Sequence, residues 1–181
     1  MTEHTVENTE FTWAMKSTHV SVTGQDHACF FDHKEIVHYE FNAQGQMANQ
    51  QCYLEMLTRL RESVPRERPG LWPDKWILHH GNAPAHDVLR VREFLAKNSM
   101  TKMDHPTYSP DFPCDFWLFP KLKNALKGQR FADLSDTQCN VKTLLRGIPE
   151  NDFQDCFQQW HQHLTKCIAS QEEYFEGNSS C

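Results

Sequence analysis

The sequence predicts an α/β fold in which helices flank a mixed sheet. Short apolar runs of strand length alternate with amphipathic segments through the middle of the chain. One apolar run leads through a polar loop into a segment with helical spacing, which is half of a βαβ unit. The chain has 181 residues, of which 39% are hydrophobic and 23% charged, so it is long enough to form one domain with a single core.

The N-terminal 27 residues keep neither strand nor helix periodicity. We therefore expect a poorly ordered leader over 1–27, a folded domain over 28–177 and a tail over 178–181, with the sheet incomplete at the N-terminus. Two β-rich runs around a polar turn at 32–35 predict a hairpin over 28–41, although the turn lacks the glycine that short hairpin turns favour.

The middle of the chain predicts further elements in order. An amphipathic helix is expected over 46–64, ended by Pro65. A strand over 75–80 and a helix over 85–97 follow, joined by a loop with glycine and proline. At 101–104 one apolar residue stands among polar neighbours, which predicts a compromised strand or a strand at the edge of the sheet.

Three helices are predicted in the last third of the chain, over 113–126, 134–145 and 150–169. The last helix carries large apolar residues along one stripe: Phe153, Phe157, Trp160, Leu164 and Ile168. Such a stripe is typical of core packing. The alternative is that it forms half of a dimer interface.

Composition indicates a soluble intracellular protein without a membrane partner. The first ten residues contain no apolar run, and no stretch reaches the roughly eighteen apolar residues that a membrane span requires. The seven cysteines are odd in number and form no Cys-x-x-Cys pair. Free thiols in a reducing compartment fit this pattern.

Charge is distributed unevenly along the chain. Residues 59–130 carry 13 Lys or Arg against 8 Asp or Glu, whereas the rest carries 5 against 16, so a +5 centre lies between flanks that sum to −11. A basic centre is compatible with non-specific contact to nucleic-acid phosphates, with Arg90, Arg92, Lys121 and Lys123 as the candidate residues. The alternative is ordinary charge segregation on solvated helices.

Two motifs lie where ligands bind in α/β sheets, beyond the carboxyl ends of strands. They are WILHHGNAPAH over 76–86 and HPTYSPDFPCDFWLFPKLK over 105–123. The first resembles WILHHDNAPAH and the second HPPYSPDLAPCDFFLFPKLK, both typical of mariner-type (Tc1/mariner) transposases. The match runs from about 30 to 177. The transposase-derived half of a histone-lysine methyltransferase fusion is similar to the same family.

The resemblance implies a ribonuclease H-like (retroviral-integrase-like) nuclear DNA transposase that holds two Mg²⁺ ions with three aspartates. Two metals can activate a nucleophile and stabilise the leaving oxygen, and hard cations require carboxylate oxygens. By resemblance, the third aspartate falls on Asp115 and the second on Gly81, which has no side chain. Only 33 residues lie between them, one fewer than in the family. The first aspartate belongs to a strand before the hairpin, for which we expect no counterpart in the leader.

We therefore expect a degenerate fragment without Mg²⁺-dependent cleavage, in which Asp115 is the only remaining candidate metal ligand. No small-molecule cofactor is expected. The polar residues His79, His80, Asn82 and Asp111 are expected to shape the site, or else to serve as ordinary turn and strand-end residues.

Three functional classes remain open at this stage: an inactive transposase fragment that contacts DNA, a protein-interaction module, and a relic without a role. As an interaction module the chain would form a homodimer or a heterodimer with intact transposase. A zinc site at His161, His163 and Cys167 is disfavoured, because structural zinc sites have four closely spaced ligands.

Overall fold

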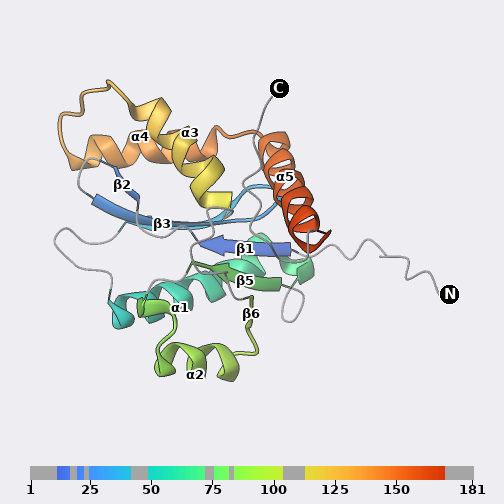
Figure 1. Ribbon diagram of the computed structural model, residues 1–181. Helices are drawn as coiled ribbons and strands as arrows, with labels where there is room; N and C mark the ends of the chain where they lie inside the picture. Colours follow the sequence, from blue (N-terminus) through green and yellow to red (C-terminus); the bar gives the residue numbers. More distant parts are fainter. Residues whose placement is uncertain are drawn as a thin grey trace. The chain divides into compact units, whose positions relative to one another are not determined.

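The chain folds into two compact units in the computed structural model, which Figure 1 shows as a ribbon. The first unit comprises Met1–Asp32 and Ile36–Pro106, and the second comprises His33–Glu35 and Thr107–Cys181. Within them the structure describes residues 12–16, 20–22, 25–41, 49–71, 76–81, 84–103 and 113–169. The predicted tail over 178–181 and the leader over 1–11 lie outside these residues.

The first unit contains a six-stranded mixed sheet. Its strands are β1 (Thr12–Lys16), β2 (Val20–Val22), β3 (Gln25–Phe31), β4 (Ile36–Phe41), β5 (Trp76–His80) and β6 (Thr101–Met103). Strand β3 pairs antiparallel with β4 along one edge, and with β2 and β1 along the other. Strand β1 then runs parallel to β5, which runs parallel to β6. An antiparallel half and a parallel half therefore meet at β1.

Strand β1 corrects the expectation of an unstructured leader over 1–27. This segment supplies β1, β2 and the beginning of β3, and β1 lies at the centre of the sheet between β3 and β5. The parallel register runs from Thr12 beside Trp76 to Lys16 beside His80. The prediction that the leader offers no strand before the hairpin was therefore wrong. Local periodicity missed β1 because its partners lie far along the chain.

The β3–β4 hairpin is confirmed, and a buried ion pair holds the start of its turn. The Asp32 carboxylate, which is 0% exposed, accepts hydrogen bonds from Arg68 Nε at 2.6 Å and Arg68 Nη2 at 3.2 Å. Two bonds from one planar guanidinium fix both distance and angle. This contact joins the turn to the residue that follows helix α1.

Helix α1 spans Gln50–Glu67 and covers part of the sheet. Its N-cap is Asn49, whose side chain accepts a hydrogen bond from the Cys52 backbone N–H at 2.9 Å. The expected end of this helix at Pro65 was wrong, because the helix continues to Glu67. A proline so close to the C-terminus removes one backbone hydrogen bond from the last turns without breaking the helix body.

One apolar core joins the central strands to α1 and to α2 (Leu89–Lys97). Its buried members include Phe30, Tyr53, Met56, Leu57, Leu60, Leu78, Val91 and Leu95. Full burial of each large side chain contributes roughly 1.5–3 kcal/mol. Strand, loop and helix follow one another after β5 as predicted, except that a short 3₁₀ turn, Pro84–His86, precedes α2. Among the described strands β6 pairs with β5 alone, which confirms an edge position.

The second unit is helical over its described residues 113–169. A π-helix, Cys114–Leu118, runs into α3 (Phe119–Leu126), and α4 (Leu134–Arg146) and α5 (Glu150–Ala169) follow. The regular helix predicted over 113–126 is thus corrected in its first turns. Prediction and structure agree for α4 and α5 to within a residue.

The N-terminal part of the apolar stripe on α5 is core, as its spacing predicted, whereas Phe157 and Leu164 are only half-buried. Phe153 and Trp160 are buried, with Trp160 only 4% exposed, and Cys156 between them is also buried. This burial within the chain argues against Phe153 and Trp160 as part of a free dimer interface. No helix among the described residues has the length and apolar character needed to cross a membrane.

Candidate catalytic site

The carboxyl end of β5 carries the first predicted motif, and its histidines point inward. His79 and His80 are both buried. The Tyr53 hydroxyl of α1 lies 3.0 Å from His80 Nδ1, and the two rings stack with centroids 5.8 Å apart. Burial raises the pKa of the Tyr53 phenol, which keeps the hydroxyl neutral. Helix α1 thus braces the end of the strand.

The loop after β5 is held from its other side by His86. Its Nδ1 donates a hydrogen bond to the carbonyl oxygen of Gly81 at 2.8 Å, because a carbonyl can only accept. The His86 ring also lies close to Tyr53 and His80, with centroids 4.1 and 5.0 Å away. The backbone at Gly81 is therefore fixed, but this position offers no carboxylate. Asn82 lies outside the described residues.

Strand β1 ends beside the end of β5, where Lys16 pairs in register with His80. This is the strand before the hairpin, where the family resemblance places the first metal-binding aspartate. The five residues of β1 are Thr-Trp-Ala-Met-Lys, and the next three in sequence are Ser-Thr-His. The strand is present but carries no Asp or Glu. A strand is therefore present at this place, but its residues offer no carboxylate.

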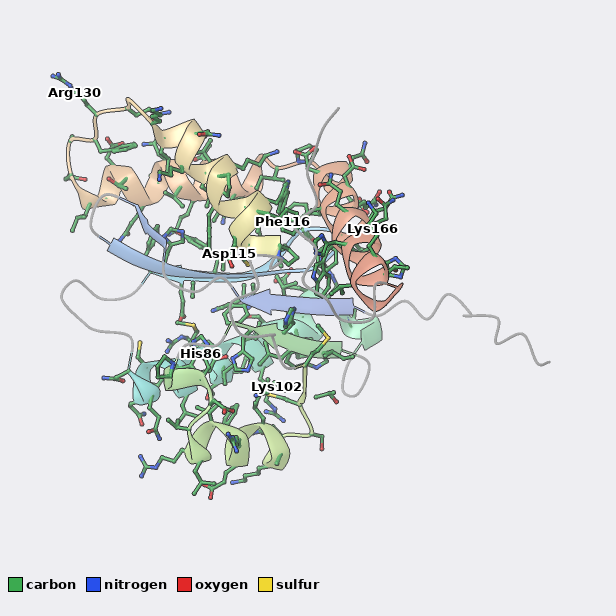
Figure 2. The ribbon with its side chains drawn as sticks, viewed as in Figure 1. His86, Lys102, Asp115, Phe116, Arg130 and Lys166 are labelled. Carbon is green, nitrogen blue, oxygen red and sulfur yellow. The ribbon has the colours of Figure 1, made fainter. Side chains whose placement is uncertain are left out.

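Asp115 lies in the second unit, in the first turn of the π-helix, and is exposed (Figure 2). The same turn is anchored to α5 by Trp117, whose ring meets the Phe153 ring edge-on at 5.1 Å. Lys121 of α3 adds an ion pair with Asp152. A π-turn shifts the register of a helix and often occurs at functional positions. Asp115, the position that the resemblance gives to the third carboxylate, thus lies at the start of a helix that contacts α5, while Asp111 lies outside the described residues.

The residues present do not fit a two-metal site of the family's type. Two divalent cations need several carboxylate oxygens. Of the three family positions, Gly81 has no side chain, β1 has no acidic residue, and Asp115 alone keeps a carboxylate. In the part of the chain that the structure describes, no three His, Cys, Asp or Glu side chains cluster in a way that could hold a metal. For the disfavoured zinc set, His161 is exposed, and the side chain of Cys167 lies outside that part.

The four predicted DNA-contact residues divide into two pairs. Arg92 forms a bidentate ion pair with Asp87, and Lys121 is engaged by Asp152 and lies 5.8 Å from the Trp117 ring centroid. Arg90 on α2 and Lys123 on α3 are exposed, and Arg92 is also exposed despite its ion pair.

Two further cations were missed by sequence reasoning. Lys127 and Arg130 are exposed around Gly128, whose φ of 80° turns the chain after α3. Figure 2 shows Arg130 extending outward from the loop between α3 and α4. The sequence Lys-Gly-Gln-Arg could have predicted their exposure, because a glycine just after a helix marks a turn at its C-terminal end.

Comparison with known proteins finds relatives that are similar over most of this chain. No protein-family model matches the chain. It is similar to the mariner Mos1 transposase of Drosophila mauritiana, with 27% identity over 150 residues that cover 81% of this chain and 44% of that protein. It is also similar to the Homo sapiens histone-lysine N-methyltransferase SETMAR, with 24% identity over 143 residues, 78% of this chain and 21% of that protein. The chain spans less than half the length of each relative.

The same relationship holds in structure. The Mos1 transposase catalytic domain, solved with raltegravir and Mn, matches 91% of this chain and 84% of its own, with a TM-score of 0.82 and 24% identity. The central parallel pair β1–β5, the antiparallel β3–β4 hairpin and the following helices therefore form a known arrangement. The chain is thus similar in sequence to mariner-type transposases, and it has the ribonuclease H-like fold of the Mos1 catalytic domain.

Proposed function

We propose that this chain is a catalytically inactive transposase domain that binds DNA without cutting it. The observation that carries the proposal is Gly81, which stands at the second carboxylate position on a backbone held by His86. Strand β1 has no acidic residue, so the position that the resemblance gives to the first carboxylate also lacks one. Metal-assisted hydrolysis needs ions that activate the nucleophile and stabilise the leaving oxygen. Asp115 alone supplies too few oxygen ligands for that chemistry.

DNA contact is assigned to the second unit. Residues 113–146 carry six Lys or Arg against three Asp. Two of those acids are occupied at the start of α4, where Asp133 caps the helix and Asp136 accepts from the Ala132 backbone N–H. Lys123, Lys127 and Arg130 remain exposed. Such a surface binds phosphates without reading sequence, and the proposed place of action is the nucleus.

Cleavage is tested with supercoiled plasmid, Mg²⁺ or Mn²⁺, and the purified chain beside its Asp115→Ala variant. The expected result is no nicking above the buffer rate by either protein. Nicking by the native chain that disappears in Asp115→Ala would overturn the claim of inactivity. Nicking that is equal in both proteins identifies a contaminating nuclease, and the preparation is then repurified until the two proteins can be compared.

DNA binding is tested by fluorescence anisotropy with a labelled duplex between 50 and 200 mM salt, concentrations at which phosphate contacts respond strongly. Three contacts predict a slope of about −2.7 in a log–log plot of affinity against salt. Removing Lys123, Lys127 or Arg130 should reduce the slope by about 0.9 each. Arg66→Ala on α1, also an exposed cation, is the matched control and should leave the slope unchanged. Equal effects in all four variants would refute this surface.

A further inference from the structure

In the second unit, the π-helix and α3 together present one exposed face. Its members follow one another at intervals of three or four residues, which places them on the same side of a helix: Phe116, Pro120, Lys123, Asn124 and Lys127. The Phe116 side chain is 38% exposed. The opposite side is core, because Leu118, Leu122 and Leu126 are buried at a regular spacing of four residues.

The neighbouring aromatic residues Phe116 and Trp117 have different surroundings. The π-turn that contains them is closed by a hydrogen bond from the Phe119 backbone N–H to the Cys114 carbonyl, five residues back. Trp117 is turned toward α5, where its ring meets the Phe153 ring edge-on at 5.1 Å. Core packing therefore uses Trp117 and leaves Phe116 at the surface.

Three cations lie on the C-terminal side of the Phe116 ring. Lys123 and Lys127 are exposed on the same face. Arg130, also exposed, follows the turn at Gly128, and Figure 2 shows it beyond the end of the helix that Phe116 begins. At about 1.5 Å per residue, Lys123 lies roughly 10 Å and Lys127 roughly 16 Å along the helix from Phe116. Phosphates in one strand of a duplex are about 3.4 Å apart along the axis, so these distances span a few nucleotides.

We propose that Phe116 is a stacking platform for an unpaired DNA base and that the three cations hold the neighbouring phosphates, so that this face prefers single-stranded to duplex DNA. The inference rests on the DNA binding proposed above and names the form of DNA that the same surface takes. Every base offers a flat π-face to an aromatic side chain. Inside a duplex a base must first be unstacked and extruded, which costs energy that a single strand does not require.

The charge beside the ring favours a base rather than a phosphate at this place. Asp115 directly precedes Phe116 and is also exposed, and a carboxylate repels the phosphate groups of DNA. A base carries no charge and can lie against the ring. Lys123 and Lys127 lie further along the helix, where a phosphate is attracted. The face therefore separates the place for a base from the place for the phosphates.

A protein partner fits the composition of this face less well. The centre of a protein interface is apolar and poor in charged residues. Among the described residues of the second unit, Phe116 is the large hydrophobic residue that is exposed, and its neighbours on the face are a proline, an asparagine and two lysines. One aromatic ring followed by cations is typical of surfaces that bind single strands by stacking and charge.

The test is fluorescence anisotropy of the full chain with three labelled probes of equal length: oligothymidylate, an abasic strand with the same phosphates but no bases, and a blunt duplex. The native chain should bind oligothymidylate about tenfold more tightly than the abasic strand, a ratio typical of one stacked base. Phe116→Leu keeps an apolar side chain but removes the π-face, so the ratio should fall to about one. Phe116→Trp should keep the ratio.

Leu89→Ala is the matched control, because Leu89 is an exposed large hydrophobic residue on α2 in the first unit. It should keep the native ratio of the two affinities. Lys123→Ala should weaken the binding of oligothymidylate and the abasic strand alike, since both have the same phosphates. A loss of the ratio in Leu89→Ala as large as that in Phe116→Leu would contradict a site at Phe116.

Equal binding of oligothymidylate and the abasic strand by the native chain would overturn the stacking platform, as would a ratio that persists in Phe116→Leu. The duplex separates this failure from failure of the proposed function. If the chain binds duplex with the expected salt dependence but shows no preference for oligothymidylate, the platform is refuted and the proposed DNA binding stands. If it binds none of the three probes, both are refuted. Circular dichroism checks the folding of each variant, and if Phe116→Leu fails to fold, the comparison of the probes with the native chain decides.

Discussion

Replacing Asp32 by alanine should destabilise the first unit more than removal of any exposed ion pair. The carboxylate is 0% exposed and its partner Arg68 is 12% exposed, so the pair is almost wholly withdrawn from water. The two hydrogen bonds at 2.6 and 3.2 Å connect the β3–β4 turn to the end of α1. Asp32→Ala leaves the guanidinium of Arg68 without this carboxylate.

The size of the stability loss depends on which charge of the ion pair remains buried after the substitution. Removing one partner of a buried pair costs about 3–5 kcal/mol. Arg68 keeps some contact with water and also donates to the Glu67 carbonyl at 2.8 Å, so Asp32→Ala should fall near the lower end, about 3 kcal/mol. Arg68→Ala leaves a fully buried carboxylate and should fall near the upper end, about 5 kcal/mol. Because each single variant leaves one buried charge without its ion-pair partner and the double variant removes both charges, the double variant should cost less than the sum.

Urea unfolding at pH 7, followed by far-ultraviolet circular dichroism, measures these differences. Hydrogen exchange at the amides of α1 and β3 shows whether the loss is confined to the first unit. The control is Arg66→Ala, which breaks an exposed pair with Glu67 on the same helix, where the two side chains are 74% and 41% exposed. This control should change stability by less than about 0.5 kcal/mol. Equal effects of Asp32→Ala and Arg66→Ala, or additive single variants, would refute the reasoning.

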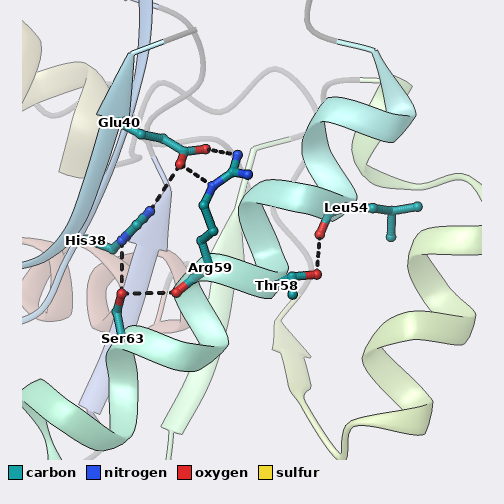
Figure 3. Close-up of polar contacts among 6 residues, drawn as sticks. All are labelled: His38, Glu40, Leu54, Thr58, Arg59 and Ser63. Atoms are coloured by element: carbon teal, nitrogen blue, oxygen red, sulfur yellow. Dashed lines mark hydrogen bonds and ion pairs between the residues drawn. The ribbon is translucent and has the colours of Figure 1, made fainter.

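Three further predictions concern single side chains. Glu40, whose contacts with Arg59 are drawn in Figure 3, has a folded pKa of about 2 against an ordinary 4.5, so its ionised form stabilises the fold above pH 4.5 and this contribution is lost as pH falls toward 2. Because solvent screens the half-exposed Arg59 partner, the contribution should be about 1 kcal/mol, and urea titrations of Glu40→Gln should show the difference from the native chain vanish over that window. Tyr53→Phe should cost about 1 kcal/mol in the same assay, because it removes the 3.0 Å contact with His80, and no loss would contradict a bracing role. In maleimide labelling followed by peptide mass analysis, exposed Cys139 should react and buried Cys29, whose thiol pKa is raised by burial, should not; labelling of Cys29 under native conditions would contradict its burial.

Elements whose signal is local were predictable from sequence. The hairpin, α4 and α5 were found because their periodicity and turn chemistry depend on nearby residues. Strand β1 could not be found in this way, because Thr-Trp-Ala-Met-Lys becomes a strand by pairing with β3 and β5. The extension of α1 past Pro65 was missed for a related reason. A distant partner, Asp32, binds Arg68 at the helix end, so tertiary contact outweighs the local breaker.

The candidate site was predictable where it rested on motif residues. The sequences of the two motifs assigned Gly81 and Asp115 to carboxylate positions of the family, and both residues lie in the part that the structure describes. It did not reveal that His80 and His86 turn inward onto Tyr53, since inward packing depends on α1, a helix distant in sequence. It also attributed the missing first carboxylate to a missing strand, whereas the strand exists with other residues. Charge counts alone could not show that the exposed Arg92 pairs with Asp87.

The position of β1 in the sheet affects how the protein folds while the ribosome synthesises it. Strand β1 ends at Lys16 and its parallel partner β5 begins at Trp76, so residues 17–75, 59 in number, must be made before the two can meet. At about 5–20 residues per second, β1 waits roughly 3–12 seconds for that partner. The antiparallel strands β2, β3 and β4 emerge during this time and need only local loop closure to pair. The central strand β1 is therefore synthesised first, but its pairing is completed only after β5, the strand with His79 and His80, has been synthesised.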